Sequence, residues 1–284
     1  MSTIKQYELE INQGKRFRFG ANWKQFLDHL TEEQIQKAEG TIKEGLAVES
    51  LEGHQFLDAG CGSGVFSLVA RRLGARVHSF DYDAESAACT DLLKQRFFPN
   101  DPDWTIDEGS VLDQEYISRL GQFDIVYSWG VLHHTGAMWD AIHNIAALVR
   151  PGGSLFIAIY NNAGRRSTHW WHIKSLYVKH PILRPFLLGY AFLTTRSGWF
   201  LRGLLKGQPL MKWRTYGDRY RGMSAWHDLV DWVGGFPYEY AKPEEVFYFI
   251  KERGFRLERL STMGADTGCN EFVFLRESKC MDNL

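Results

Sequence analysis

Residues 56–64 read Phe-Leu-Asp-Ala-Gly-Cys-Gly-Ser-Gly, and this stretch decides the fold. A short apolar run leads to Asp58, and glycine then occupies every second position from Gly60 to Gly64. Apolar residues recur at helical spacing over residues 65–73. The pattern predicts a strand, a glycine turn and a helix. Because glycine lacks a Cβ, a ligand can approach the backbone N–H groups at the start of that helix.

A second predicted strand, Val77–Asp81, ends on a carboxylate. Asp81 lies at about the spacing of an acidic residue that accepts both hydroxyls of a ribose. The turn reads Asp-x-Gly-x-Gly-x-Gly, which differs from the Gly-x-Gly-x-x-Gly of pyrophosphate-binding turns. Asp58 at the mouth of the turn repels phosphate and suits an ammonium group. A nucleoside with an amino-acid tail and no phosphate fits, and S-adenosylmethionine is such a molecule.

On these residues the chain resembles the class I S-adenosylmethionine-dependent methyltransferases, over about residues 50–160 and 241–276. It is most similar to their small-molecule branch, which modifies quinones and natural products. The resemblance implies an α/β, Rossmann-like methyltransferase fold with a mostly parallel seven-stranded sheet and an antiparallel last strand. It also implies an N-terminal helical cap and an inserted helical lid. The expected parts are the cap (1–47), the cofactor-binding core (48–160), the basic aromatic lid (161–240) and the C-terminal part of the core (241–284).

The rest of the chain fits this plan when it is divided by its apolar periodicity. Residues 21–47 are expected to be helical, and Tyr7–Ile11 alternates like a short edge strand. A tight turn is expected at 150–153. Further strands are predicted at 55–58, 104–108, 123–128, 154–160, 255–260 and 271–275, and further helices at 84–97, 114–120, 138–149 and from Pro243.

Ligands of such sheets bind at the carboxyl ends of the strands, which places the expected cofactor contacts. The departure from the family pattern is Ser110, because related enzymes often carry an Asp there for the adenine amino group. Trp23 is expected over the sulfonium or the adenine, and the alternative is a purely packing role. The expected cofactor residues are Asp58, Gly60, Gly62 and the backbone of Ser128 and Trp129 for the methionine end, with Cys61 inside the glycine turn, Asp81 for the ribose, and Tyr82, Ser110, Val111 and Trp23 around the adenine and sulfonium.

Four side chains are candidates for the general base of methyl transfer: His134, His133, Tyr160 and His227. His133 and His134 follow the fourth predicted strand, and His134 is the favoured one of the two. The alternative is that they only shape the pocket. His227 is four residues before Asp231, so the two share a helix face. No third ligand is spaced to complete a metal site with them, and no metal is expected.

The predicted lid carries a charge imbalance. Residues 161–222 hold 12 Lys and Arg against a single acid, while the whole chain has a net charge of −1. The basic excess suits an anionic acceptor, a peripheral membrane contact, or simply a solvated surface. Ile182–Leu201 is long enough to span a bilayer, but Arg184 and Arg196 interrupt it, so a transmembrane helix is not expected.

The acceptor is expected to be a small molecule, anionic or lipid-like, with oxygen favoured over nitrogen. Base-methylating enzymes usually carry an Asp/Asn-Pro-Pro-aromatic turn after the fourth strand, and this chain has Ser128-Trp-Gly-Val131 there, so DNA is not expected as a partner. Two alternatives stay open: an RNA or protein methyltransferase that docks through residues 161–222, and a non-catalytic scaffold. Four scattered cysteines and an N-terminus without an apolar stretch favour a cytoplasmic location.

Overall fold

The fold is built on one seven-stranded sheet with the strand order β3-β2-β1-β4-β5-β7-β6. A computed structural model describes residues 3–196 and 225–278, apart from the side chains of residues 3–5 and 227. Strands β1 to β5 are mutually parallel, and β7 lies antiparallel between β5 and β6. This confirms the predicted sheet. The strands are β1 Gln55–Ala59, β2 Arg76–Asp81, β3 Trp104–Glu108, β4 Phe123–Trp129, β5 Val149–Tyr160, β6 Phe255–Ser261 and β7 Cys269–Arg276.

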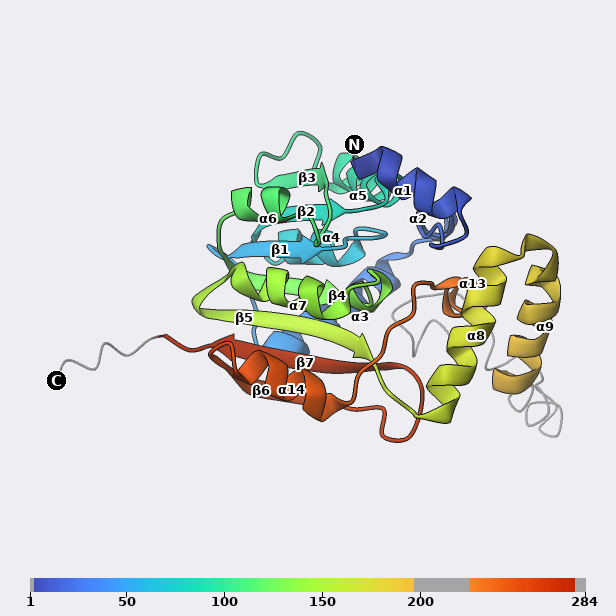
Figure 1. Cartoon of the computed structure of the whole chain (residues 1–284). Helices are drawn as coiled ribbons and strands as arrows, with labels where there is room; N and C mark the ends of the chain where they lie inside the picture. Colours follow the sequence, from blue (N-terminus) through green and yellow to red (C-terminus); the bar gives the residue numbers. More distant parts are fainter. Residues whose placement is uncertain (1–2, 197–224, 279–284) are drawn as a thin grey trace, which may run out of the picture.

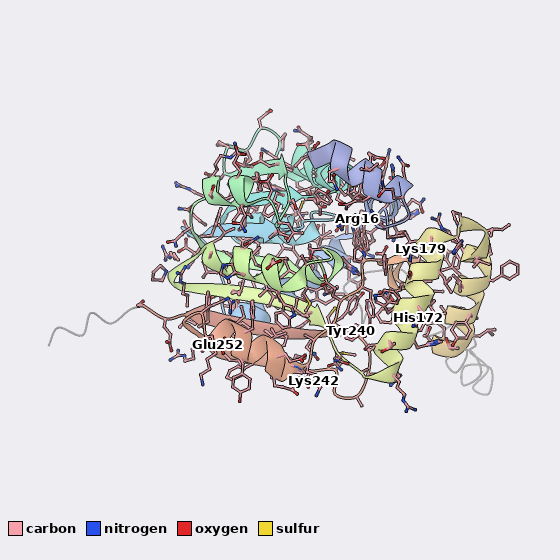
Figure 2. The ribbon with its side chains drawn as sticks, viewed as in Figure 1. Arg16, His172, Lys179, Tyr240, Lys242 and Glu252 are labelled. Carbon is pink, nitrogen blue, oxygen red and sulfur yellow. The ribbon has the colours of Figure 1, made fainter. Side chains whose placement is uncertain are left out.

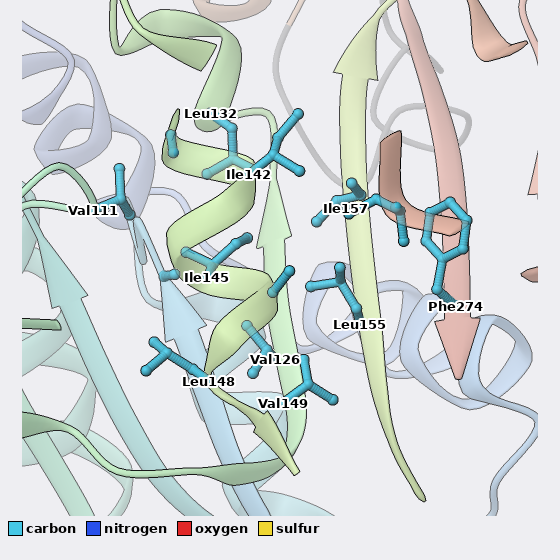
Figure 3. Close-up of a cluster of buried hydrophobic side chains, with 14 of the residues drawn as sticks. Val111, Val126, Leu132, Ile142, Ile145, Leu148, Val149, Leu155, Ile157 and Phe274 are labelled. Carbon is cyan, nitrogen blue, oxygen red and sulfur yellow. The ribbon is translucent and has the colours of Figure 1, made fainter. Parts of the chain in front are cut away.

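Helices cover both faces of the sheet (Figure 1). On one face α3 (Glu32–Leu46), α4 (Val65–Arg72) and α5 (Ala84–Phe97) enclose a buried cluster around Phe56 and Tyr127. The opposite face is covered by α6 (Gln114–Arg119), α7 (Met138–Ala147) and α14 (Pro243–Lys251). Figure 3 shows that second cluster, where α7 places Ile142 and Ile145 against the apolar side chains of β4 and β5. A sheet buried on both faces explains why its central strands are nearly all apolar.

Side-chain caps define several helix starts. Thr31 and Gln34 form a reciprocal capping box before α3. Asp83 accepts a hydrogen bond from the backbone N–H of Glu85 at the start of α5. Asp113 accepts hydrogen bonds from two backbone N–H groups at the start of α6, which is the geometry of an N-cap residue.

The N-terminal segment is helical, so the edge strand predicted at Tyr7–Ile11 is wrong. It lies in α1 (Thr3–Asn12), which is followed by α2 (Gly20–Leu27). The residues Ile4, Tyr7 and Ile11 recur at helical spacing, and that period overrides the local alternation. Tyr7 is buried, and its hydroxyl donates a 2.6 Å hydrogen bond to Asp83. This contact holds α1 against the start of α5.

The tight turn predicted at 150–153 is also wrong, because these residues belong to β5. Val149 already pairs with Phe123, and the register between β4 and β5 shifts before Ile125 pairs with Ser154. Gly152, with φ of +77°, lies within the irregular stretch. The Pro-Gly-Gly sequence therefore marks a bulge in a long strand rather than the end of one.

The insertion between β5 and α14 forms a helical hairpin beside the sheet (Figure 1). Its described elements are α8 (Arg165–Lys179), the 3-10 turn η2 (Pro181–Leu183), α9 (Arg184–Thr195) and α13 (Ala225–Gly234). A third apolar cluster, which includes Trp170, Leu229 and Tyr238, holds it together. Within the described residues, no helix is long and apolar enough to cross a membrane. The last residues of the apolar run 182–201 lie outside the described residues.

Candidate active site

A cavity of about 1390 Å³ opens at the carboxyl ends of β1, β2, β4 and β5, between the cap and the lid. It lies where the strand order reverses between β1 and β4. Typical ligand pockets measure roughly 300–1,000 Å³, so this one has room for a cofactor and a second molecule. The guanidinium of Arg16 donates hydrogen bonds to the carbonyl oxygens of His134 and Thr135 and so joins two segments of the cavity wall. Figure 2 shows Arg16 on the side of the sheet that faces the lid.

The glycine turn needs its glycines. Gly60 has φ of +86°, and a Cβ there would lie 2.3 Å from the side chain of Val131. Gly62 has φ of +55°, and a Cβ there would lie 3.1 Å from Nε1 of Trp23. Both positions line the cavity. Any larger residue at Gly60 would displace the wall of the pocket, which fits a backbone that lies against a ligand.

Asp58 is a buried carboxylate at the end of β1. It accepts a 2.6 Å hydrogen bond from the hydroxyl of Ser67, which in turn accepts one from Ser79. Trp104 donates its indole N–H to Ser79 and completes the chain. Burial raises the pKa of Asp58 to about 7, with a further contribution from the nearby charge of Asp81. The protein therefore holds a carboxylate at the wall of the cavity although burial of its charge destabilises the folded state.

Asp81 closes the glycine turn from β2. Its Oδ2 accepts the backbone N–H of Gly62 at 2.9 Å, and its Oδ1 accepts that of Asp83 at 2.9 Å. Burial raises the pKa of Asp81 to about 7, although these backbone hydrogen bonds oppose the shift. Tyr82 follows it on the wall, with its ring 5.2 Å from Tyr7, and burial raises the pKa of Tyr82 to about 12.

The remaining residues predicted around the cofactor divide into two groups. Cys61, Ser110, Val111, Trp23 and Trp129 line the cavity. Burial raises the pKa of Cys61, whose sulfur accepts a hydrogen bond from Thr90, so a reactive thiolate is not favoured. Ser128 is not among the lining residues, and its hydroxyl donates to the carbonyl oxygen of Ala59.

The two adjacent histidines have different surroundings in the 3-10 turn η1 (Leu132–His134). His133 is completely buried outside the cavity lining, and its Nδ1 accepts the backbone N–H of Tyr160 at 3.3 Å. His134 lines the cavity. Its Nδ1 lies 2.6 Å from the carbonyl oxygen of Pro237. A carbonyl only accepts, so this nitrogen carries the proton and Nε2 is left as the acceptor.

Burial is the main cause that lowers the pKa of His134 to about 3, and the charge of Lys174 adds to it. The imidazole is therefore neutral at physiological pH. Tyr160 also lines the cavity, with its ring 5.4 Å from that of His134, and burial raises the pKa of its hydroxyl well above the usual range. Of the candidate bases, His134 thus has an unprotonated nitrogen at the cavity. The side chain of His227, on α13, lies outside the described residues.

Three further residues shape the site and were not predicted. Arg16 donates a hydrogen bond to the carbonyl oxygen of His134 in the cavity wall. Asp83 accepts hydrogen bonds from the hydroxyl of Tyr7 and from the backbone N–H of Gly20. Lys174 on α8 is fully buried beside aromatic rings. The N-cap position of Asp83, directly before an apolar helix, is a signal that could have found it. No local sequence signal indicates the roles of Arg16 and Lys174. Within the described residues, no cluster of His, Cys, Asp and Glu could hold a metal ion.

Comparison with known families identifies the chain. A family model described as "Methyltransferase domain" matches residues 21–186, more than half of the sequence. The chain belongs to this methyltransferase family. The predicted class I S-adenosylmethionine-dependent methyltransferase is thereby confirmed, and S-adenosylmethionine is the cofactor of that class.

The chain spans about half the length of the curated relatives that it matches. A ubiquinone biosynthesis O-methyltransferase from Erwinia tasmaniensis is 33% identical over 42% of this chain and 46% of its own length. A second, from Methylocella silvestris, is 32% identical over 44% and 47%. A tRNA U34 carboxymethyltransferase from Methylococcus capsulatus is 30% identical over 42% and 37%.

Solved structures agree on the fold. An O-methyltransferase family protein from Burkholderia thailandensis superposes with a TM-score of 0.52 at 13% identity, over 87% of this chain and 58% of the other. The N-terminal domain of EvdMO1, determined with S-adenosylhomocysteine and D-fucose, gives a TM-score of 0.50 at 12% identity, over 87% and 84%. At such identities the likeness concerns the architecture alone.

Proposed function

We propose that this methyltransferase transfers a methyl group to a hydroxyl oxygen of a small-molecule acceptor, with His134 receiving the proton. The observation that carries the proposal is that one cavity joins the glycine turn, Asp81 and His134. Relatives named as ubiquinone O-methyltransferases favour oxygen as the acceptor atom over nitrogen.

The residues at the cofactor end fit S-adenosylmethionine. Asp58 offers a buried carboxylate to the ammonium group, and the glycine turn leaves the backbone uncovered. Asp81 would accept hydrogen bonds from the ribose hydroxyls, and Ser110 with Val111 would face the adenine. A phosphate group would be repelled by both carboxylates. When bound, the cofactor supplies a methyl group on a positively charged sulfur, whose departure as a neutral thioether needs little assistance.

The protein's own part in the reaction is positioning, exclusion of water and removal of a proton. Nε2 of His134 makes no hydrogen bond to any residue that the structure describes, so it can accept one from the acceptor hydroxyl. As the oxygen gains its bond to carbon, the O–H proton passes to Nε2. The Pro237 carbonyl holds the ring through Nδ1–H, and the resulting imidazolium would donate from both nitrogens.

The proposal is tested with methyl-labelled cofactor and a panel of phenols, quinols, hydroxy acids and amines. His134→Asn keeps an N–H close to the Pro237 carbonyl but removes Nε2, so we expect kcat to fall by roughly 10²- to 10⁴-fold while binding of S-adenosylhomocysteine is unchanged. His143→Asn, on the exposed face of α7, is the matched control. Equal activity in His134→Asn would remove the histidine from the reaction. Methylation of RNA that weakens steeply with salt would support the alternative substrate.

We also propose that the lid contacts an anionic membrane surface, where a lipid-like acceptor would be found. Ile182, Phe186 and Leu193 recur at helical spacing and are 81%, 74% and 64% exposed. Lys179 and Arg184 are exposed beside them, and the described part of the lid has no acid before Asp228. Apolar side chains flanked by cations suit an interface with acidic lipid headgroups. The test is flotation with vesicles of phosphatidylglycerol and phosphatidylcholine. Protein that stays at the bottom of the gradient would contradict the contact.

A further inference from the structure

The lid presents a carboxylate to the cavity that has no role in the methyl transfer proposed above. Asp231 lies on α13 and lines the cavity. Its Oδ1 accepts a 2.7 Å hydrogen bond from Nδ2 of Asn22, on the cap helix α2. Its Oδ2 makes no hydrogen bond to any residue in the described part of the chain. The cap therefore fixes the orientation of this carboxylate and leaves one oxygen available.

The backbone carbonyl of Asp231 and the imidazole of His134 both lie against Gly235. The backbone N–H of Gly235 donates to the carbonyl oxygen of Asp231 at 2.8 Å. A Cβ at Gly235 would lie 2.9 Å from that carbonyl oxygen and 3.2 Å from Nε2 of His134. The end of α13 thus meets the open nitrogen of the histidine. A glycine at this point keeps the nitrogen uncovered.

Aromatic rings form the wall next to these two polar groups. The ring of Trp232 lies 5.4 Å from that of Tyr160, which lies 5.4 Å from the ring of His134. Trp170 stands 5.3 Å from Trp232, and all four side chains line the cavity. An acceptor with a flat apolar face can pack here while its polar edge reaches the carboxylate and the imidazole.

A buried lysine and two carboxylates lie behind this wall. Lys174 is fully buried, donates to the carbonyl oxygen of Trp232, and lies 4.2 Å from the centre of that ring. Burial raises the pKa of Asp231 and the charge of Asp228 adds to this, whereas Asn22 and Lys174 oppose the shift. Burial lowers the pKa of Lys174 to about 7, so this amine carries only part of its charge near neutral pH. A neutral hydroxyl can form a hydrogen bond with Asp231 in either charge state of the lysine.

We propose that Asp231 binds a second hydroxyl of the acceptor, beside the oxygen that is methylated, and so makes the enzyme selective for dihydroxy compounds. This rests on the proposed function and names the substrate class of that site. Aromatic diols and saccharide diols share the required chemistry. A site with a polar group oriented for a hydroxyl discriminates strongly against an analogue that lacks it, because the group is then left unpaired.

The experiment compares each compound that carries adjacent hydroxyls with an analogue that lacks one of them: catechol with phenol, and methyl β-D-glucopyranoside with its 3-deoxy analogue, which keeps no two hydroxyls on adjacent carbons. Binding to the complex with S-adenosylhomocysteine is measured by calorimetry, and methylation is measured with labelled cofactor. In the wild type we expect the favoured diol to bind roughly 10- to 100-fold more tightly than its analogue. The pair in which the diol binds more tightly than its analogue shows whether the acceptor is an aromatic diol or a saccharide diol. Equal binding of both members in both pairs, or no binding, would overturn the proposal.

Asp231→Asn is the decisive variant because it keeps the oxygen that accepts from Asn22 and replaces Oδ2 with a donor. We expect the preference for the diol to fall to about one while binding of S-adenosylhomocysteine is retained. Asp140→Asn, which changes an exposed carboxylate on α7 outside the cavity lining, is the matched control. A preference that persists in Asp231→Asn would overturn the proposal. Intact diol preference in binding together with no methylation would contradict the proposed function instead.

Discussion

Replacing Asp58 with Asn should stabilise the cofactor-free protein at alkaline pH. The amide has the shape of the carboxyl group and can still accept the hydrogen bond from Ser67. It removes a charge that is held in a side chain only 2% exposed. A buried carboxylate of this kind lowers the stability of the folded state whenever it is ionised.

The magnitude follows from the pKa of Asp58, which burial raises from 3.8 to about 7. A shift of about three units at 1.36 kcal/mol each corresponds to about 4 kcal/mol. The pKa of Asp58 in the folded protein lies above its value in the unfolded chain. The wild type therefore has this full contribution to its free energy of unfolding below about pH 4 and loses it as the pH rises to about 7. The charge of Asp81 causes part of the pKa shift of Asp58. We therefore expect Asp58→Asn to raise the free energy of unfolding by about 2–4 kcal/mol at pH 8 and to change it little at pH 4.

The assay is urea unfolding of the cofactor-free wild type and variant at pH 4 and pH 8. Binding of S-adenosylhomocysteine is measured on the same samples by calorimetry. We expect the variant to be more stable at pH 8 but to bind the ligand more weakly, because the carboxylate is needed for the ammonium group. Equal or lower stability of Asp58→Asn at pH 8 would refute the reasoning. So would a gain that is the same at both pH values.

Two further substitutions test the walls of the cavity. Gly235→Ala places a methyl group 2.7 Å from Cε1 and 3.2 Å from Nε2 of His134, so the imidazole must shift, and we expect kcat to fall at least tenfold with unchanged cofactor binding, as measured with labelled cofactor; full activity would show that this nitrogen is not used. Tyr7→Phe removes the 2.6 Å hydrogen bond to Asp83, and we expect a loss of about 1–3 kcal/mol in urea unfolding, whereas an unchanged midpoint would mean that α1 is held by packing alone.

Much of the core could be predicted because its signals are local. Alternation of strands and helices, the glycine turn and the acidic end of β2 are each visible within a few residues, and the sheet order follows from the family resemblance. The two errors have local causes as well. The alternation of polar and apolar residues in Tyr7–Ile11 is typical of a strand, but the segment is helical. The glycines after Pro151 are typical of a turn, but they form a bulge within β5.

The acceptor side could be predicted only in part, because its contacts join distant segments. Asn22 and Asp231 are 209 residues apart, and no periodicity relates them. The sequence favoured His134 over His133 without a structural reason. The reason is that the 3-10 turn directs His133 into the core and His134 to the cavity. The role of Lys174 depends on burial among the rings of Trp232 and Tyr238, which only the packed lid creates.

The most direct test of the account is calorimetric binding of S-adenosylmethionine and S-adenosylhomocysteine to the wild type and to Asp81→Asn. Asp103→Asn, a half-exposed carboxylate just before β3, serves as the control. We predict that the wild type and the control bind both ligands and that Asp81→Asn binds them roughly 10- to 100-fold more weakly, because its side chain no longer accepts two ribose hydroxyls as an anion. Full affinity in Asp81→Asn, or no binding to the wild type, would contradict the assignment of this cavity to the cofactor.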